Sequence, residues 1–266
     1  MFVVKKSFII YNKSMKLKEL DSYFRSFLSI DELVRTDISL NGVQVENSGD
    51  ITCIAFAVDA CMEVFRRARE AGAQMVFVHH GLFWGHEQSV TGNHYQRLKF
   101  LLDNNIALYA AHLPLDIHPE LGNNVSLAKA AGLTDLEPFG EFRGIKVGIK
   151  GKFKTPLTTA QVLSNLGYDS SELLTCLSFG KEKNITGAVI TGGGEHDVNA
   201  AIDEDIDLYI TGDAAHVVYH TCLENKINMI SAGHYRTEVY GVQNVAKKVS
   251  DELNLKTLFI DVPTGL

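Results

Sequence analysis

The apolar positions of this chain follow two alternating patterns. Continuous apolar runs are typical of buried strands, and segments with apolar positions three and four residues apart are typical of amphipathic helices. In the first half, the predicted strands are residues 51–59, 75–80 and 106–112. The predicted helices are residues 17–28, 61–72, 94–104 and 123–132, the last with an Asn cap and a terminal Gly. This alternation favours a largely parallel sheet covered by helices.

The second half repeats the alternation of strands and helices. Its predicted strands are residues 145–153, 172–180, 184–194, 207–213, 226–234 and 257–261, and its predicted helices are residues 158–167, 196–204, 214–225 and a long segment from about Thr237. Residues 136–144 concentrate one Pro and two Gly between the two series, which is typical of a boundary. We therefore predict an α/β protein with two lobes, residues 15–138 and 139–266, after an extension of residues 1–14. Met15 is an alternative start.

Composition and charge narrow the class of protein. With 266 residues, of which 45% are hydrophobic, the chain can bury a substantial core. A net charge of −7 and a pI of about 5.8 argue against nucleic-acid binding, which needs a basic surface. The four cysteines form no CxxC pair and are expected to be core or free thiols. Because no apolar run approaches the roughly 20 residues of a membrane span, and the N-terminal segment is a poor signal peptide, we expect a cytoplasmic protein.

Two adjacent histidines, His79 and His80, follow an apolar strand in the segment VFVHHGLFWGHEQ. Open α/β sheets usually place their ligand sites at the carboxyl ends of strands. Neighbouring side chains on a strand point to opposite faces, so both rings reach one site only if His80 has entered the turn opened by Gly81. Two metal ions close together would use both rings. The alternative is one core histidine and one surface histidine.

A carboxylate follows the next predicted strand, in the segment AAHLPLDIHPE, which contains His112 and Asp116. Pro114 and Pro119 are expected to exclude a helix here and to stiffen a short loop that holds Asp116 in fixed geometry. Asp116 is therefore a candidate metal ligand. A helix cap is the alternative, because a short carboxylate beside a helix start is common.

His234 and Glu238 follow a third apolar strand, in the segment ISAGHYRTEVYG. They are four residues apart, so they share one face of a helix that begins at or before His234. Glu238 has the reach and the two oxygens to bridge a pair of metal ions. Arg236 and Tyr235 lie between them, and they are candidates for an anion clamp and a hydrogen-bond donor, or for structural roles.

Together, these three strand ends supply the nitrogen and carboxylate ligands that divalent transition metals accept. A further strand end, DLYITGDAAHVVYH, carries Asp213 and His216. These two side chains suit substrate binding or general acid–base catalysis, and helix capping by Asp213 is the alternative. The three glycines 192–194 stand between a strand and a helix start. Their backbone N–H groups suit a phosphate, or they form a simple tight turn.

Five motifs of this chain resemble those of the NIF-three-like family, the GTP cyclohydrolase 1 type 2-like dinuclear metal-centre proteins. They are NGVQVE (41–46), VHHGLFW (78–84), AHLPLD (111–116), ITGD (210–213) and GHYRTE (233–238), and they occur in the family's order. The resemblance spans nearly the whole chain from about Met15. It implies a site for two divalent ions, zinc, manganese or iron, with the ligands His79, His80, Asp116, His234 and Glu238.

The resemblance also implies a two-lobed α/β fold with mixed sheets flanked by helices, assembled as a ring-like homohexamer. The chain departs from the family at Gly81, where many members have Pro, and at Asp213, where Glu is frequent. Neither change removes a ligand, but the second leaves the role of that carboxylate open.

Two functions are compatible with such a site. The first is a metal-dependent hydrolase of a C–N or phosphoester bond, in which His112, Asp213 or His216 would move protons. The family name suggests a nucleotide-like substrate such as GTP, although the acidic chain offers no obvious triphosphate-binding surface. The second is a non-catalytic protein that stores or delivers metal, or docks a partner. Turnover separates the two.

Overall fold

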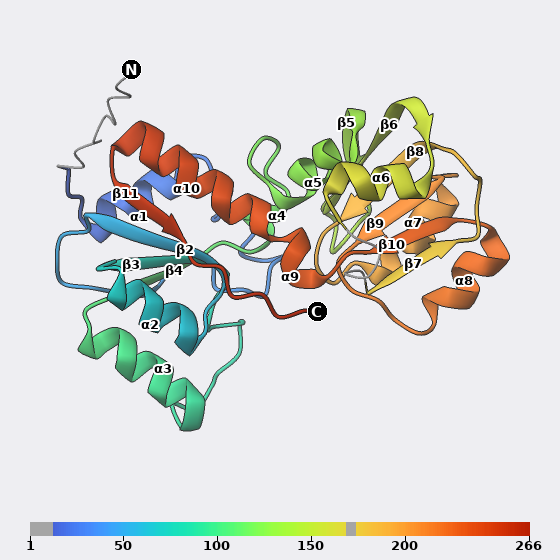
Figure 1. Ribbon diagram of the computed structural model, residues 1–266. Helices are drawn as coiled ribbons and strands as arrows, with labels where there is room; N and C mark the ends of the chain where they lie inside the picture. The colour runs from blue at the N-terminus through green and yellow to red at the C-terminus, as the bar shows by residue number, and fades with distance from the viewer. Residues whose placement is uncertain (1–12, 169–173) are drawn as a thin grey trace, which may run out of the picture.

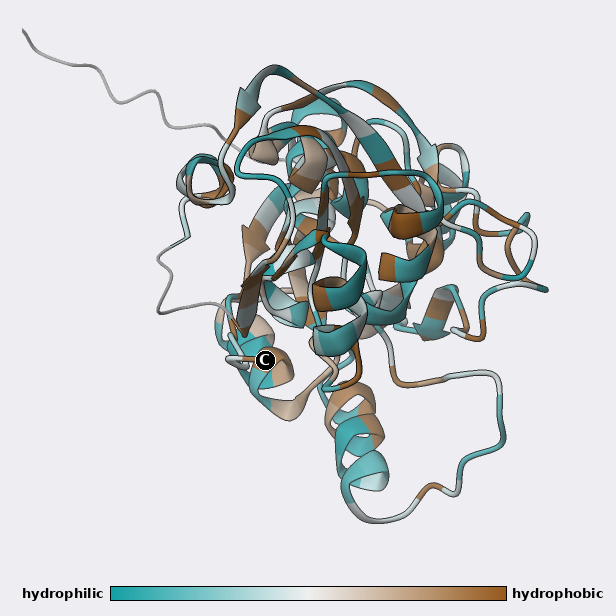
Figure 2. Ribbon diagram, turned by 90° about the vertical axis from the view of Figure 1, so that its right-hand side faces the viewer, coloured by the Kyte–Doolittle hydropathy of each residue, from teal (hydrophilic) through white to brown (hydrophobic). Residues whose placement is uncertain are grey.

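The computed structural model describes residues 13–168 and 174–266, so the predicted extension of residues 1–14 lies almost wholly outside it. Two mixed sheets, each flanked by helices, form two lobes side by side (Figure 1). Apolar residues concentrate in the strands and on the helix faces that meet them (Figure 2). None of the helices formed by these described residues is long and apolar enough to cross a membrane. The predicted α/β fold with mixed sheets is confirmed.

The first lobe is built on a five-stranded sheet with the strand order β1-β4-β3-β2-β11. Its strands are β1 (Gly42–Val45), β2 (Cys53–Asp59), β3 (Met75–His80), β4 (Ala107–Ala110) and β11 (Lys256–Phe259). The last four run parallel, as predicted, and β1 pairs antiparallel with β4 at the edge. The parallel strands therefore end at the same edge of the sheet.

Helices cover both faces of this sheet, because successive strand residues point to opposite sides. One face packs against α1 (Leu17–Arg25) and the long α10 (Val239–Leu253), with Phe56 of β2 among the fully buried residues between them. The other face packs against α2 (Met62–Glu70) and α3 (Gly92–Asp103).

The second lobe is built on a six-stranded sheet with the strand order β5-β6-β8-β9-β10-β7. Its strands are β5 (Leu133–Phe139), β6 (Gly148–Leu157), β7 (Thr175–Ser178), β8 (Asn184–Ile190), β9 (Leu208–Thr211) and β10 (Asn228–Ser231). The central β8, β9 and β10 run parallel, and the outer pairings are antiparallel. The sheet is covered on one face by α5 (Asn123–Ala131) and α6 (Thr159–Leu166), and on the other by α7 (Val198–Asp203) and α8 (Val218–Asn225).

The chain crosses between the two sheets before residue 138, where the sequence predicts the boundary of the lobes. Strand β5 already pairs with β6 in the second sheet, and Pro138 lies opposite Ile149 in that pairing. Proline is compatible with this position because β5 is an edge strand. Helix α10 and strand β11 then return to the first lobe, so both ends of the described chain build it.

A one-turn helix, α4 (Leu113–Asp116), follows β4 where the sequence predicts a helix-free loop. Pro114 occupies the second position of α4. The first N–H groups of a helix have no partner inside the helix, so a proline costs little there. The prediction that Pro114 excludes a helix is therefore wrong, and α4 fixes the place of Asp116 at its last turn.

Candidate metal centre

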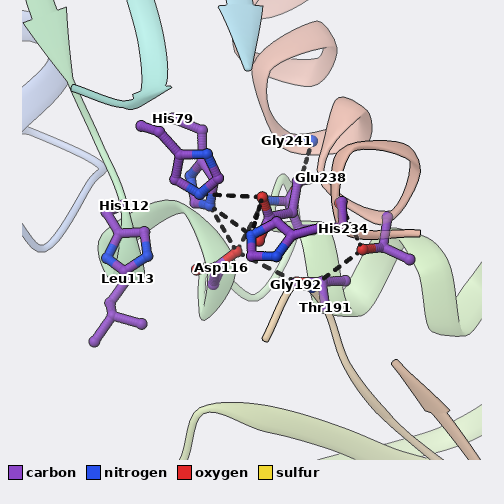
Figure 3. Close-up of polar contacts among 12 residues, drawn as sticks. His79, His112, Leu113, Asp116, Thr191, Gly192, His234, Glu238 and Gly241 are labelled. Atoms are coloured by element: carbon purple, nitrogen blue, oxygen red, sulfur yellow. Dashed lines mark hydrogen bonds and ion pairs between the residues drawn. The ribbon is translucent and has the colours of Figure 1, made fainter. Parts of the chain in front are cut away.

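Histidines and carboxylates from both lobes converge where the parallel strands of the first sheet end. His79 and His80 close β3, so the prediction that His80 must already lie in the turn is wrong. The chain that leaves β10 of the second lobe forms a one-turn helix, α9 (His234–Thr237), and Glu238 follows directly before α10. Figure 3 shows the rings of His79 and His234 pointing toward the carboxylate of Glu238.

His79 is fully buried and points its Nε2 atom at two carboxylates. Its Nδ1 atom lies 2.9 Å from the carbonyl oxygen of Ala111, which fixes the orientation of the ring. Nε2 lies 3.4 Å from Oδ1 of Asp116 and 3.5 Å from Oε1 of Glu238. These distances exceed those of a good hydrogen bond, and Nε2 has no hydrogen-bond partner among the described residues.

Two further histidines share the other oxygen of Glu238. Nε2 of His80 lies 3.2 Å from Oε2 of Glu238, and Nε2 of His234 lies 3.3 Å from the same atom. Their Nδ1 atoms face carboxylates, Asp59 at 2.9 Å from His80 and Asp213 at 3.0 Å from His234. A carboxylate on Nδ1 fixes the tautomer of an imidazole and leaves Nε2 free to bind a metal.

His112 joins this cluster from the turn between β4 and α4. Its Nδ1 atom lies 2.9 Å from Oδ1 of the buried Asp37, whose other oxygen accepts a hydrogen bond from the N–H of Leu113. The His112 ring centroid lies 5.1 Å from that of His79 and 5.7 Å from that of His80. Like His80 and His234, His112 has a carboxylate on Nδ1, which leaves its Nε2 atom available to a metal ion. His112 is therefore a candidate ligand as well as the predicted proton carrier.

The donor atoms form three groups that could hold a metal ion, and within each group they lie within 4.8 Å of one another. The groups are His79 with His80 and His112, His80 with His234 and Glu238, and His79 with Asp116 and Glu238. Glu238 belongs to two groups. Its Oε2 atom, like Nε2 of His79, is buried without a hydrogen bond from any described residue. Buried polar atoms are rarely left unpaired, so these two fit a bound metal ion.

Asp116 is held in place by side chains from both lobes. Nδ2 of Asn123 donates to Oδ1 of Asp116 at 2.8 Å, and Oγ1 of Thr191 lies 3.4 Å from the same oxygen. Asn123 in turn accepts a hydrogen bond from the N–H of Gly241 in α10 at 2.7 Å. The predicted Asn cap of α5 is wrong, because the cap residue is Gly122. The amide of Asn123 instead ties Asp116 to α10.

Gly192 lets the loop after β8 pass directly against the cluster. A Cβ atom at this position would fall on Oε1 of Glu238 and would lie 3.0 Å from Nε2 of His234. Its φ of 64° also favours glycine. The Gly192 carbonyl accepts a hydrogen bond from the N–H of Asp213 at 2.9 Å. Of the two roles predicted for glycines 192–194, this packing fits the tight turn.

The cluster opens into a cavity of about 390 Å³ whose walls come from both lobes. The first lobe contributes Trp84 and His112, and the second contributes Phe142 and Ile190. His216 does not line this cavity. It is exposed and borders a separate hollow beside α8. The structure therefore does not bring His216 to the other predicted site residues.

Comparison with known proteins identifies the family. A family model described as Duf34/NIF3 (NGG1p interacting factor 3) matches residues 15–265. The chain belongs to the Duf34/NIF3 family. It is 41% identical to the "GTP cyclohydrolase 1 type 2 homolog" of Treponema pallidum (strain Nichols), over 95% of this chain and 100% of that protein. It is 42% identical to a Pyrococcus abyssi protein of the same name, with the same coverage.

Solved structures of the family have the same fold. The chain is similar to protein ybgI, of unknown function, with a TM-score of 0.86 and 32% identity over 95% of this chain and 100% of that chain. It is similar to HcgD from Methanocaldococcus jannaschii, solved in reduced form, with a TM-score of 0.80 and 28% identity over 94% and 99%. The resemblance to the NIF-three-like family is confirmed.

Two carboxylates of this Duf34/NIF3 site, Asp37 and Asp59, are not predicted from the sequence. Asp59 does carry a signal, because it ends the apolar run that forms β2 and pairs in register with His80. Asp37 carries none, because it lies outside any periodic segment and is 75 residues from His112, the ring that it holds.

The electrostatics of the Duf34/NIF3 cluster differ from those of isolated histidines. Burial lowers the pKa of His79, but the carboxylates of Asp116 and Glu238 outweigh it and raise this pKa to about 10. Burial also opposes protonation of His234, whereas Glu238 and Asp213 raise its pKa to about 9. Burial would raise the pKa of Glu238, but His79 and His234 hold it well below its ordinary value. Without metal, the cluster is therefore a buried network of ion pairs at pH 7.

We expect metal binding at pH 7 to release protons, because His79 and His234 must lose them to coordinate. Calorimetric titration in two buffers of different ionisation enthalpy measures the number released. In the metal-free protein the raised pKa values stabilise the fold below about pH 6.5, the unfolded value, and this stability is lost as pH rises through 9 to 10. The melting temperature without metal should fall over that interval. Metal binding at pH 7 with no proton release would contradict this assignment.

Proposed function

We propose that this protein is a metal-dependent hydrolase that binds two divalent ions and acts on a small molecule in the cavity between its lobes. The observation that carries the proposal is a pair of buried atoms, Nε2 of His79 and Oε2 of Glu238, that receive no hydrogen bond from the described residues and lie beside a cavity of about 390 Å³. A structural cluster closed by hydrogen bonds would give both atoms a partner in good geometry, whereas here they lie only at ion-pair distance from their neighbours.

The proposed ligands are the six side chains of the three groups, with Glu238 shared between the two ions: His79, His80, His112, Asp116, His234 and Glu238. When bound, two divalent ions lower the pKa of a water molecule and polarise the bond that it attacks. Imidazole and carboxylate ligands suit zinc, manganese and iron alike.

The chain's own contribution is to hold the ligands in fixed geometry before substrate arrives. Asp37, Asp59 and Asp213 each face Nδ1 of one histidine and thereby direct its Nε2 atom into the cluster. In this proposal Asp213 is a positioning residue, and His112 is a ligand. The relatives named GTP cyclohydrolase 1 type 2 homolog support a C–N bond of a ring as the target.

Turnover tests the proposal. The protein, loaded with manganese, zinc or iron, is incubated with cyclic amides, nucleosides, nucleotides and phosphoesters, and products are separated by chromatography. We expect metal-dependent turnover that is absent from Glu238→Gln. Asp251→Asn is the matched control, because it removes an exposed carboxylate from the same helix, α10. Metal binding without turnover of any substrate would contradict the hydrolase and favour storage or delivery of metal.

A further inference from the structure

The cavity beside the cluster has walls that do not suit a polyphosphate. Away from the candidate ligands, its lining is largely apolar, with Trp84 on one lobe and Phe142, Val147 and Ile190 on the other. No lysine or arginine is among the described residues that line it. Phosphate groups are normally bound by such side chains or by free backbone N–H groups.

Two divalent ions in the proposed site would not supply the missing positive charge. Two divalent ions bring four positive charges, and Asp116 and Glu238 offset two of them as ligands. The three carboxylates of Asp37, Asp59 and Asp213 lie directly behind the histidines and would more than offset the remaining two charges. A loaded site therefore has little attraction left for a molecule with several negative charges.

The carboxylate of Asp197, on the cavity wall, has no hydrogen-bond partner in the part of the chain that the structure describes. Asp197 follows the glycine turn and is half-buried. Its carboxylate receives no hydrogen bond and forms no ion pair with residues of the described ranges. Burial raises the pKa of Asp197 most, and the nearby carboxylate of Glu195 raises it further. His196 lowers this pKa, but by less. A carboxylate only accepts hydrogen bonds, so it suits a ligand that donates them.

Trp84 provides the surface on which a flat ligand could lie. Its indole N–H donates to the carbonyl oxygen of Gly81 at 3.1 Å, so the ring is fixed by the turn that follows His80. Its ring centroid lies 5.1 Å from that of His112 and 5.9 Å from that of His80. An aromatic ring on Trp84 would therefore lie beside the candidate metal ligands.

We propose that the cavity binds an unphosphorylated heterocycle with an amidine edge, whose adjacent N–H groups donate to Asp197 while the ring packs on Trp84. This inference rests on the proposed function for the reaction, and it adds the class of substrate and the residue that selects it. A carboxylate accepts two parallel N–H hydrogen bonds from such an edge. A site that offers this acceptor discriminates against analogues that lack one of the two N–H donors.

The single tryptophan of the chain makes binding directly measurable, since Trp84 is the only source of indole fluorescence. The zinc-loaded protein is titrated with three probes: guanosine, which has the amidine edge, inosine, which lacks the amino group, and guanosine 5′-monophosphate. We expect guanosine to bind at least about 10-fold more tightly than inosine, which would lose one hydrogen bond to Asp197. It should also bind more tightly than guanosine 5′-monophosphate, because no lysine or arginine is among the described residues that line the cavity. Equal affinity for all three would overturn the proposal.

The variant Asp197→Asn tests the residue itself. It keeps the size of the side chain, and we expect it to abolish the preference for guanosine over inosine while zinc content and melting temperature stay at wild-type values. Asp203→Asn is the matched control, because Asp203 is exposed on the adjacent α7, and it should keep the preference. A preference that survives in Asp197→Asn would contradict the assignment. Selective guanosine binding without turnover would support this inference and count against the hydrolase, so the two proposals fail separately.

Discussion

Glu238→Gln is expected to abolish binding of both metal ions. Glu238 is 3% exposed, belongs to two of the three candidate groups, and directs one oxygen toward His79 and the other toward His80 and His234. Replacing one of its oxygens with an amide NH₂ would remove an anionic donor that the two proposed sites share. Affinity should fall by more than about 100-fold, the upper range for losing an outer partner of a ligand. Calorimetric titration of the metal-free variant measures it.

Asp251→Asn on the same helix is the control for a general effect of removing a carboxylate, and it should bind metal like the wild type. The fold of Glu238→Gln is checked by circular dichroism and by its melting temperature without metal. A folded Glu238→Gln protein that keeps one tight site would contradict a shared glutamate. It would leave only the one group that does not contain Glu238, which is His79 with His80 and His112.

Asp213→Asn is expected to lower the affinity for one metal ion by about 10- to 100-fold, the usual effect of removing an outer partner of a ligating histidine. The reason is the 3.0 Å contact between Oδ1 of Asp213 and Nδ1 of His234. In the metal-free variant, the pKa of His234 should also fall below its value of about 9, since Asp213 is among the groups that raise it. Nuclear magnetic resonance of the histidine ring measures this pKa.

The alternative role for Asp213 is proton transfer, and saturating metal separates the two roles. A positioning residue loses affinity but recovers turnover when metal is saturating. A proton carrier keeps its affinity and stays slow. His216→Ala is the companion variant, since His216 is exposed and borders a different hollow, and it should change neither quantity. Slow turnover of Asp213→Asn at saturating metal, with normal affinity, would contradict the positioning role.

His79, His80 and Asp116 lie together, as the sequence predicts, because parallel strands end at the same edge of a sheet. The ends of β3 and β4 are adjacent in register, so residues that follow them are neighbours in space. His234 and Glu238 follow a strand of the other lobe, yet they lie at the same edge because α10 returns to pack on the first sheet. His216 shows its limit, since the chain after β9 leads away from the cluster before α8 begins.

Other features depend on contacts that no local pattern records. Asp37 is recognisable only from its partner His112, far away in the chain. Strand β5 contains Pro138, a residue that in the sequence indicates a loop. The pairing of β5 with β6 decides where the chain passes from the first sheet to the second. Asn123 looks like a helix cap in the sequence, yet its amide joins Asp116 to α10. The homohexamer and the cytoplasmic location implied at the sequence level stay predictions.

The central claim is that six side chains from two lobes hold two divalent ions around Glu238. Elemental analysis of the protein, purified without added metal, then loaded with manganese or zinc and freed of excess ions, tests it most directly. The proposed function predicts two equivalents of metal per chain, and the Glu238→Gln variant should retain neither. One equivalent or none in the loaded wild-type protein would contradict the two-metal centre.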